Sequence, residues 1–133
     1  MAQLTEEEVY ARLGEEGFAR LVRAFYAQVP TDSVLGPMYE RSLAGRSGDM
    51  ADAEIRLRDF LIGRFGGPMR YVEQHGHPRL RQRHVRFVID SSGAERWIEL
   101  MERAMDETGV DDDVRETLRP YFRATAMHMV NRQ

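Results

Sequence analysis

Apolar residues recur every three or four positions along most of this chain, and the alternating pattern of a half-buried strand is essentially absent. The clearest helical stripes begin near Phe18, Met50, Trp97 and Val114. A chain of 133 residues is long enough to bury one core and too short for two. The sequence therefore predicts an all-α fold, a single domain over residues 1–133 with about six helices that cross rather than form a regular bundle.

Local signals mark where these helices begin and end. Thr5 and Glu8 have the spacing of a capping box, and Ser92 and Glu95 repeat it before a later stripe. Stop signals follow the stripes at Gly14, Pro30, Gly66–Pro68 and Gly109. These positions predict separate helices over roughly 5–14, 17–30, 50–66 and 92–109, and a last helix after the acidic run at 111–113.

Two segments lack clear periodicity. Residues 40–49 contain two glycines and two serines, which is typical of a mobile loop. Between Pro68 and Asp90 the pattern is weak, although Pro78 is compatible with the first turn of a short helix that runs toward His84.

Composition excludes several classes of protein. The formal net charge of −3 gives no electrostatic case for nucleic-acid binding, and the chain has no cysteine for disulfides, iron–sulfur clusters or thiolate metal sites. The N-terminal segment is acidic where a secretory signal would be basic, and no apolar run has the length of a membrane span. We therefore expect a cytoplasmic protein that binds no nucleic acid and does not insert into a membrane.

Positive charge is concentrated around one histidine. The run GHPRLRQRH at 76–84 places Arg79, Arg81 and Arg83 before His84, although the chain as a whole is slightly acidic. An anionic ligand held beside a metal-binding histidine would explain this pattern. The run also fits a solvated basic face with an ordinary half-buried histidine, and the spacing alone does not separate the two interpretations.

Three polar aromatic residues lie on otherwise apolar faces: Tyr26, Tyr39 and Trp97. Each offers one directed hydrogen bond, and a buried phenol or indole usually has a partner. The simpler interpretation is three separate bonds to backbone groups. If His84 holds a cofactor, the three donors could instead serve a ligand in a dry pocket, where hydrogen bonds are stronger than in water.

Other catalytic patterns are missing. The sequence has no evident Ser-His-Asp or Cys-His arrangement and no glycine-rich phosphate loop after a strand. His75 and His77 form an H-x-H pair, but a structural turn explains this pair better than a metal site because no companion ligand is nearby. His128 fits the inner side of the last helix better as a core histidine than as a ligand.

With these residues in view, the chain resembles the truncated haemoglobins of group II, within the globin superfamily. The resemblance covers nearly the whole chain, and it is carried by FYAQV at 25–29, FLIGRFGGPMRYVEQHGHPRLRQRH at 60–84, WIELMERAMD at 97–106 and TAMHMVN at 125–131. The combination of GGP, a tyrosine, GHP and a terminal R-x-R-H is its most specific part. The family fold is a two-over-two helical sandwich around haem b.

The resemblance implies a set of site residues. His84 matches the proximal iron ligand, and the positions of the distal ligand pocket are matched by Tyr26, Tyr39, Leu57 and Trp97. The positions around the haem and its propionates are matched by Ala53, Arg56, Phe60, Tyr71, Arg83 and Phe87. Two features depart from the family: the loop at 40–49 is longer, and Arg86 stands where proline is usual.

The function implied by the resemblance is reversible binding of O2, and of other diatomic ligands such as NO or CO, with slow release from a polar pocket. The enzymatic alternative is haem-dependent nitric oxide dioxygenation or peroxidase-like detoxification, which would need an unidentified reductase. A third alternative is a cofactor-free helical module that uses its arginines to contact an acidic partner. A homodimer is compatible with the sequence, which indicates neither the oligomeric state nor the physiological ligand.

Overall fold

The computed structural model describes residues 4–43, 50–76 and 89–131, and these ranges contain six helices and no strand. The helices are α1 (Glu8–Gln28), α2 (Leu35–Leu43), α3 (Met50–Arg64), α4 (Arg70–His75), α6 (Ser91–Thr108) and α7 (Asp112–His128). The predicted all-α class is therefore confirmed. None of the helices in the described ranges is long and apolar enough to cross a membrane.

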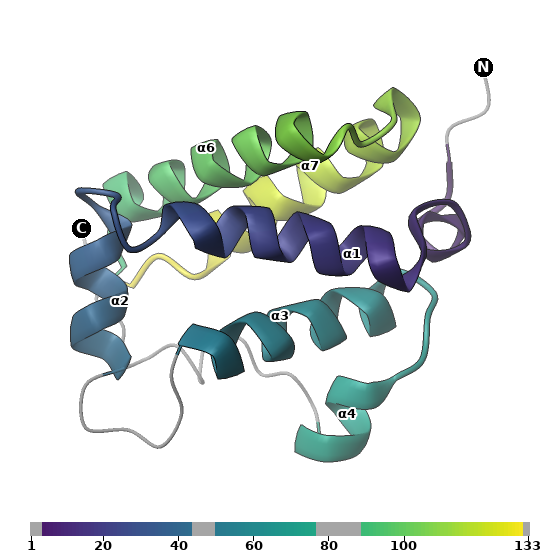
Figure 1. The fold of residues 1–133 in the computed structure, drawn as a ribbon, viewed down its shortest axis with the longest axis horizontal. Coiled ribbons are helices and arrows are strands. Elements are labelled where there is room, and N and C mark those ends of the chain that lie inside the picture. The colour runs from purple at the N-terminus through teal and green to yellow at the C-terminus, as the bar shows by residue number, and fades with distance from the viewer. Residues whose placement is uncertain (1–3, 44–49, 77–88, 132–133) are drawn as a thin grey trace.

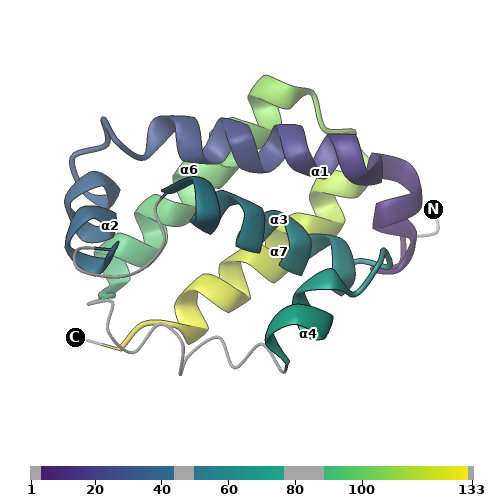
Figure 2. The same ribbon diagram turned by 60° about the horizontal axis from the view of Figure 1, so that its bottom comes forward.

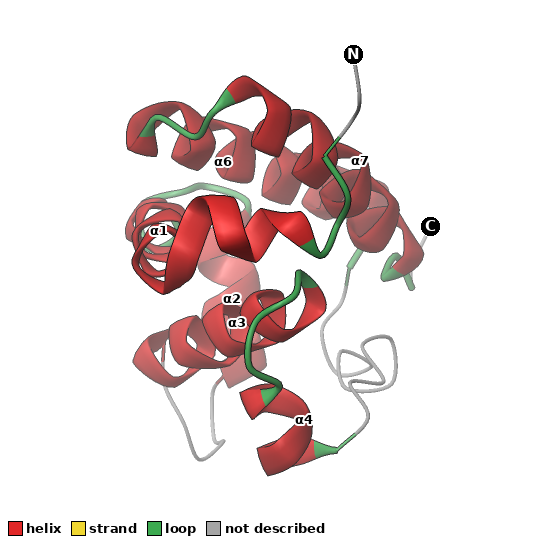
Figure 3. Cartoon of the chain, turned by 90° about the vertical axis from the view of Figure 1, so that its right-hand side faces the viewer, coloured by secondary structure: helices red, strands yellow, loops and turns green. Residues whose placement is uncertain are grey.

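The four longest helices form two antiparallel pairs (Figure 1). Helix α1 packs against α3 and also against α6, and α6 packs against α7. The two pairs cross obliquely, as the turned view shows (Figure 2). This arrangement is the predicted two-over-two sandwich. The shorter α2 lies at one end of the long helices (Figure 1), and α4 lies below α3 (Figure 3).

The interior follows the apolar stripes of the sequence. The helix α1 buries Phe18, Leu21, Val22 and Phe25, which is the stripe that the sequence predicted between Gly17 and Pro30. The other large and fully buried side chains come from α1, α2, α3, α6 and α7 and from the residue after α3; they are Val9, Leu35, Leu61, Ile62, Phe65, Leu100, Met101, Met105 and Leu118.

Glycines set two sharp changes of direction. Gly14 has φ 74° and ψ 170° and interrupts the helical geometry of α1, so the predicted stop is present as a kink between two helical segments. Gly66 has φ 102°, and a Cβ built there would lie 2.3 Å from the carbonyl oxygen of Glu7. The turn after α3 therefore requires glycine, because it presses directly against the start of α1.

The two predicted capping boxes were wrong in their details. The Thr5 hydroxyl hydrogen-bonds the Glu8 carboxylate at 3.0 Å, and the residue before α1 makes no side-chain cap. At α6 the capping carboxylate belongs to Asp90, which accepts from the amide of Gly93 at 2.8 Å, so the helix begins before Ser92. The predicted stop at Gly109 is confirmed by its left-handed conformation, with φ 66° and ψ 38°.

Two other expectations also need correction. Residues 40–43 belong to α2, so the predicted loop over 40–49 was wrong for its first part, while 44–49 lie outside the described residues. The helix α4 was not predicted, because six residues are too few to show a period. The short helix expected from Pro78 toward His84 lies outside the described residues.

Candidate functional site

Tyr26, Tyr39 and Trp97 come from three helices and meet in one cluster, which we call the polar aromatic cluster. The rings of Tyr26 on α1 and Tyr39 on α2 are perpendicular, with their centroids 5.9 Å apart. Phe25 contacts both Tyr26 and Trp97, with centroid separations of 5.0 and 5.1 Å. Phe122 of α7 completes the surroundings of Trp97, at 5.7 Å. Three polar groups are thus held by edge contacts between aromatic rings.

The cluster is joined by side-chain hydrogen bonds. Burial raises the pKa of Tyr26 well above its ordinary value, and the nearby Tyr39, through its charge and a hydrogen bond, adds to the shift. Burial also raises the pKa of Tyr39, whereas hydrogen bonds with Tyr26 and Trp97 act in the opposite direction. An indole N–H can only donate, so Tyr39 accepts from Trp97. Tyr26 and Tyr39 thus affect each other's pKa in opposite directions, and both phenols stay protonated at neutral pH.

This arrangement differs from the simpler interpretation of three separate backbone bonds, because the donors converge on one hydroxyl. Tyr26 is only 9% exposed, and Tyr39 and Trp97 are half-buried against the core. Buried donors gathered at one point can serve an acceptor that enters between them, since hydrogen bonds strengthen where water is excluded.

One face of α3 adds apolar residues beside this cluster. Ala53 is buried, while Leu57 and Phe60 are half-buried and pack against the core. These positions share one face because they are spaced by four and three residues. The ring of Phe60 contacts the buried Tyr71 of α4 edge to face, with centroids 5.6 Å apart.

Arg56 is half-buried on the same helix, and its charge acts on the cluster. It lowers the pKa of Tyr26, against the larger effect of burial, while Glu54 raises it. The candidate residue Arg56 therefore lies within electrostatic reach of Tyr26 as well as on the helix expected to flank the cofactor.

The remaining candidates, Arg83, His84 and Phe87, lie outside the described residues, as do Arg79, Arg81 and Arg86. Within the described ranges, no group of three or more histidine or acidic side chains is arranged to hold a metal ion. The metal ligand therefore remains a sequence prediction at His84.

Sequence reasoning missed two residues beside the cluster. Asp32 is a buried carboxylate at the start of α2, and Arg96 on α6 binds it. Asp32 stands three positions before Leu35, which is a recognisable N-cap signal. Its partner could not be found this way, because 64 positions separate the two residues.

Comparison with known proteins places this arrangement in a family. The model of the bacterial-like globins matches residues 8–131. A group 2 truncated hemoglobin of Bacillus subtilis, YjbI, is 37% identical over 122 residues, which are 92% of this chain and 87% of that protein. This chain therefore belongs to the bacterial-like globins, as a truncated haemoglobin of group II.

Solved structures agree with this assignment. The truncated oxygen-avid haemoglobin from Bacillus subtilis superimposes with a TM-score of 0.83 at 36% identity, over 92% of this chain and 98% of that one. A thermostable hemoglobin from the actinobacterium Thermobifida fusca gives 0.81 at 40% identity, over 96% and 98%. Membership of this family implies a haem cofactor and a diatomic gas as ligand.

The described residues fit such a cofactor. A haem is a flat and largely apolar group, and it needs an apolar wall and a polar ligand pocket in contact with each other. Leu57 and Phe60 leave apolar surface that the core does not cover, and the small Ala53 stands on the same face. The polar aromatic cluster supplies hydrogen-bond donors beside that wall.

Proposed function

We propose that this chain binds haem b through His84 and uses the polar aromatic cluster to retain O2, which it releases slowly. The observation that carries the proposal is the convergence of Tyr26 and Trp97 on the Tyr39 hydroxyl. The haem-side positions would be Ala53, Arg56, Phe60, Tyr71, Arg83 and Phe87, and Leu57 would line the ligand pocket. The oxygen-avid character of the Bacillus subtilis haemoglobin supports a retaining role.

Haem supplies, when bound, a ferrous iron at which a diatomic gas can bind. The protein then contributes donors that are already oriented. Hydrogen bonds with Tyr26 and Trp97 hold the Tyr39 hydroxyl in place, so an incoming acceptor meets a prearranged set of donors. Little further ordering is needed, which favours retention of the ligand.

The size of the effect follows from the number of donors. One neutral hydrogen bond contributes roughly 1 kcal/mol net, which is about a fivefold change in a rate or equilibrium constant. Two or three bonds together would slow the release of O2 by about one to two orders of magnitude.

The experiment is optical and kinetic. The purified protein is expected to take up haem and show a Soret band, and His84→Ala is expected to lose the native bands. Trp97→Phe is expected to release O2 about fivefold faster, because it removes one neutral donor. A protein without a Soret band after haem addition would leave a cofactor-free module as the better interpretation. An unchanged release rate in Trp97→Phe would remove Trp97 from the donors.

Nitric oxide dioxygenation or peroxidase-like turnover is a second candidate, favoured by one observation. Tyr26 and Tyr39 are phenols that are protonated at neutral pH and lie against each other, so they can polarise a peroxide or a bound oxidant as well as retain O2. Mixing the oxygenated protein with nitric oxide separates the two functions. Rapid single-turnover consumption, with a reductase restoring the ferrous state, would support the enzyme, and slow consumption would support retention.

A further inference from the structure

The start of α2 is held by a single buried carboxylate. The Asp32 side chain is 3% exposed, and its Oδ2 accepts from the amides of Val34 at 3.0 Å and Leu35 at 2.8 Å. Its Oδ1 accepts from Nε and Nη2 of Arg96, at 2.7 and 2.6 Å. One carboxylate thus caps α2 and ties it to α6.

This pair connects two of the three helices that carry members of the polar aromatic cluster, α2 and α6. Arg96 immediately precedes Trp97 on α6, and Asp32 caps the helix that carries Tyr39. The same two helices also meet at Met38 and Gly93, where the Met38 sulfur would lie 3.6 Å from a Cβ built on the glycine. The Nη1 atom of Arg96 binds Oε2 of the exposed Glu99 at 2.8 Å, and this second contact helps to fix the orientation of the guanidinium.

A small motion at the cap is enough to disturb the cluster. Tyr39 stands seven positions after Asp32, so at the rise of a helix it lies about 10 Å from the ion pair in the direction of α2. A tilt of roughly 6° about the cap would displace Tyr39 by about 1 Å over that length. A displacement of this size lengthens a hydrogen bond beyond the range in which it contributes.

We infer that Asp32 and Arg96 are positioning residues, whose ion pair holds the Tyr39 hydroxyl within hydrogen-bonding reach of Trp97. The inference rests on the proposed function only for its consequence on O2 release. The position of Trp97 relative to Tyr39 is a property of the protein chain, and it can be measured separately.

The test uses the haem-loaded protein with Arg96→Gln, the conservative variant Arg96→Lys and the matched control Arg119→Gln. Arg119 pairs with Glu102, so its ion pair joins α7 to α6 rather than α2 to α6. Trp97 is the only tryptophan, so the ultraviolet resonance Raman signal of the indole N–H reports on this one hydrogen bond. Arg96→Gln is expected to shift the signal toward a weaker bond and to speed O2 release about three- to tenfold.

Arg96→Lys is expected to recover part of both effects, and Arg119→Gln is expected to change neither. The decisive comparison adds Arg96→Gln to Tyr39→Phe. If Arg96 acts through Tyr39, the second substitution produces no further acceleration of O2 release, whereas a general loss of structure would add to it. Asp32→Asn, which keeps an oxygen for the two amides, tests the same pair from the other side if Arg96→Gln does not fold.

An unchanged indole signal in both Arg96→Gln and Asp32→Asn would overturn the inference, and so would additive effects in the double variant. The proposed function fails differently: the protein would not bind haem, or Trp97→Phe and Tyr39→Phe would release O2 at the wild-type rate. The Raman shift would still decide whether the ion pair positions Tyr39.

Discussion

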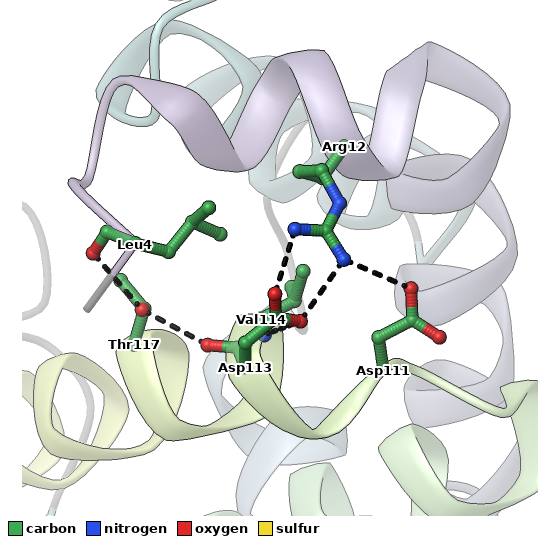
Figure 4. Close-up of polar contacts among 6 residues, drawn as sticks. All are labelled: Leu4, Arg12, Asp111, Asp113, Val114 and Thr117. Atoms are coloured by element: carbon green, nitrogen blue, oxygen red, sulfur yellow. Dashed lines mark hydrogen bonds and ion pairs between the residues drawn. The ribbon is translucent and has the colours of Figure 1, made fainter. Parts of the chain in front are cut away.

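Polar groups at two places in the molecule have the same chemistry and very different surroundings. Beside the polar aromatic cluster, Asp32 and Arg96 form an ion pair whose side chains are 3% and 29% exposed. Near the N-terminus, Arg12 binds Asp113 at 2.6 and 3.2 Å and Asp111 at 3.4 Å, and these side chains are 43–69% exposed (Figure 4). We call this second group the N-terminal clasp.

Both ion pairs fasten a helix to a distant part of the chain, but burial changes what each can contribute. Water and salt screen the N-terminal clasp, so an exposed pair of this kind adds little to stability. Asp32 also accepts from the amides of Val34 and Leu35 at the start of α2, so removing it would leave Arg96 without its buried partner and the helix without its cap. The contrast predicts that substitutions near the cluster have large effects and those in the clasp small ones.

The largest effect is expected at Phe25, which lies beneath the cluster and is fully buried. Phe25→Ala removes the ring that contacts both Tyr26 and Trp97, and the cavity that remains should lower the free energy of unfolding by about 3–5 kcal/mol. Denaturant unfolding with Phe25→Leu as the milder variant measures this. A loss below 1 kcal/mol, on the order of a surface substitution, would show that the cluster does not depend on this packing.

A smaller effect is expected at Asp32. Asp32→Ala removes the cap of α2 and should reduce the free energy of unfolding by about 1–2 kcal/mol. Asp32→Asn retains an acceptor for the amides and should cost less. Equal losses in the two variants would assign the stabilisation to the ion pair with Arg96 rather than to the cap.

Acid should weaken both ion pairs, in ways that salt distinguishes. Hydrogen bonding from Arg96 lowers the pKa of Asp32, and hydrogen bonding from Arg12 lowers that of Asp113. Because each folded-state pKa lies below the unfolded value of about 4, the contribution is complete above that pH and is lost as the pH falls through the folded value. Unfolding measured across this range should show a steeper loss in the wild type than in Asp32→Asn.

The acid series should be repeated at about 1 M salt. The contribution of Asp113 to the free energy of unfolding should then disappear, and most of the contribution of Asp32 should remain, because only the exposed pair is strongly screened. If high salt abolished the difference between wild type and Asp32→Asn, the buried pair would be behaving as a surface pair.

The smallest effect is expected in the N-terminal clasp itself. Arg12→Gln removes both ion pairs to Asp111 and Asp113, and the bond between the Thr117 hydroxyl and the Leu4 carbonyl oxygen remains. The thermal midpoint should stay within the error of calorimetry, with Arg23→Gln as a surface control. A clear drop in the thermal midpoint of Arg12→Gln but not of Arg23→Gln would show that the exposure of an ion pair does not predict its contribution to stability.

The sequence predicted the long helices well because their periodicity is repeated over several turns. The stripe from Phe18 to Val29 and the stop at Gly109 are both present, since each depends on neighbours along the chain. The resemblance to the family assigned Tyr26, Tyr39 and Trp97 to one ligand pocket. Helix propensity and periodicity could not have made this assignment, because they describe one helix at a time.

What the sequence missed depends on contacts between distant segments or on very short segments. Asp32 and Arg96 meet only after α2 folds against α6, and no local pattern records this. The sequence placed the cap of α6 at Ser92, whereas Asp90 caps the helix in the structure. Both residue types are good caps, so the sequence alone could not choose between two starts this close together.

Release of O2 from Tyr39→Phe, compared with Tyr121→Phe, tests the central claim most directly. Both substitutions remove a single phenolic oxygen, but Tyr121 lies outside the cluster, against Phe65 and Phe122. Stopped-flow measurement on the haem-loaded proteins should give about fivefold or greater acceleration for Tyr39→Phe and the wild-type rate for Tyr121→Phe. Equal rates in both variants and the wild type would contradict the claim that the polar aromatic cluster retains the ligand.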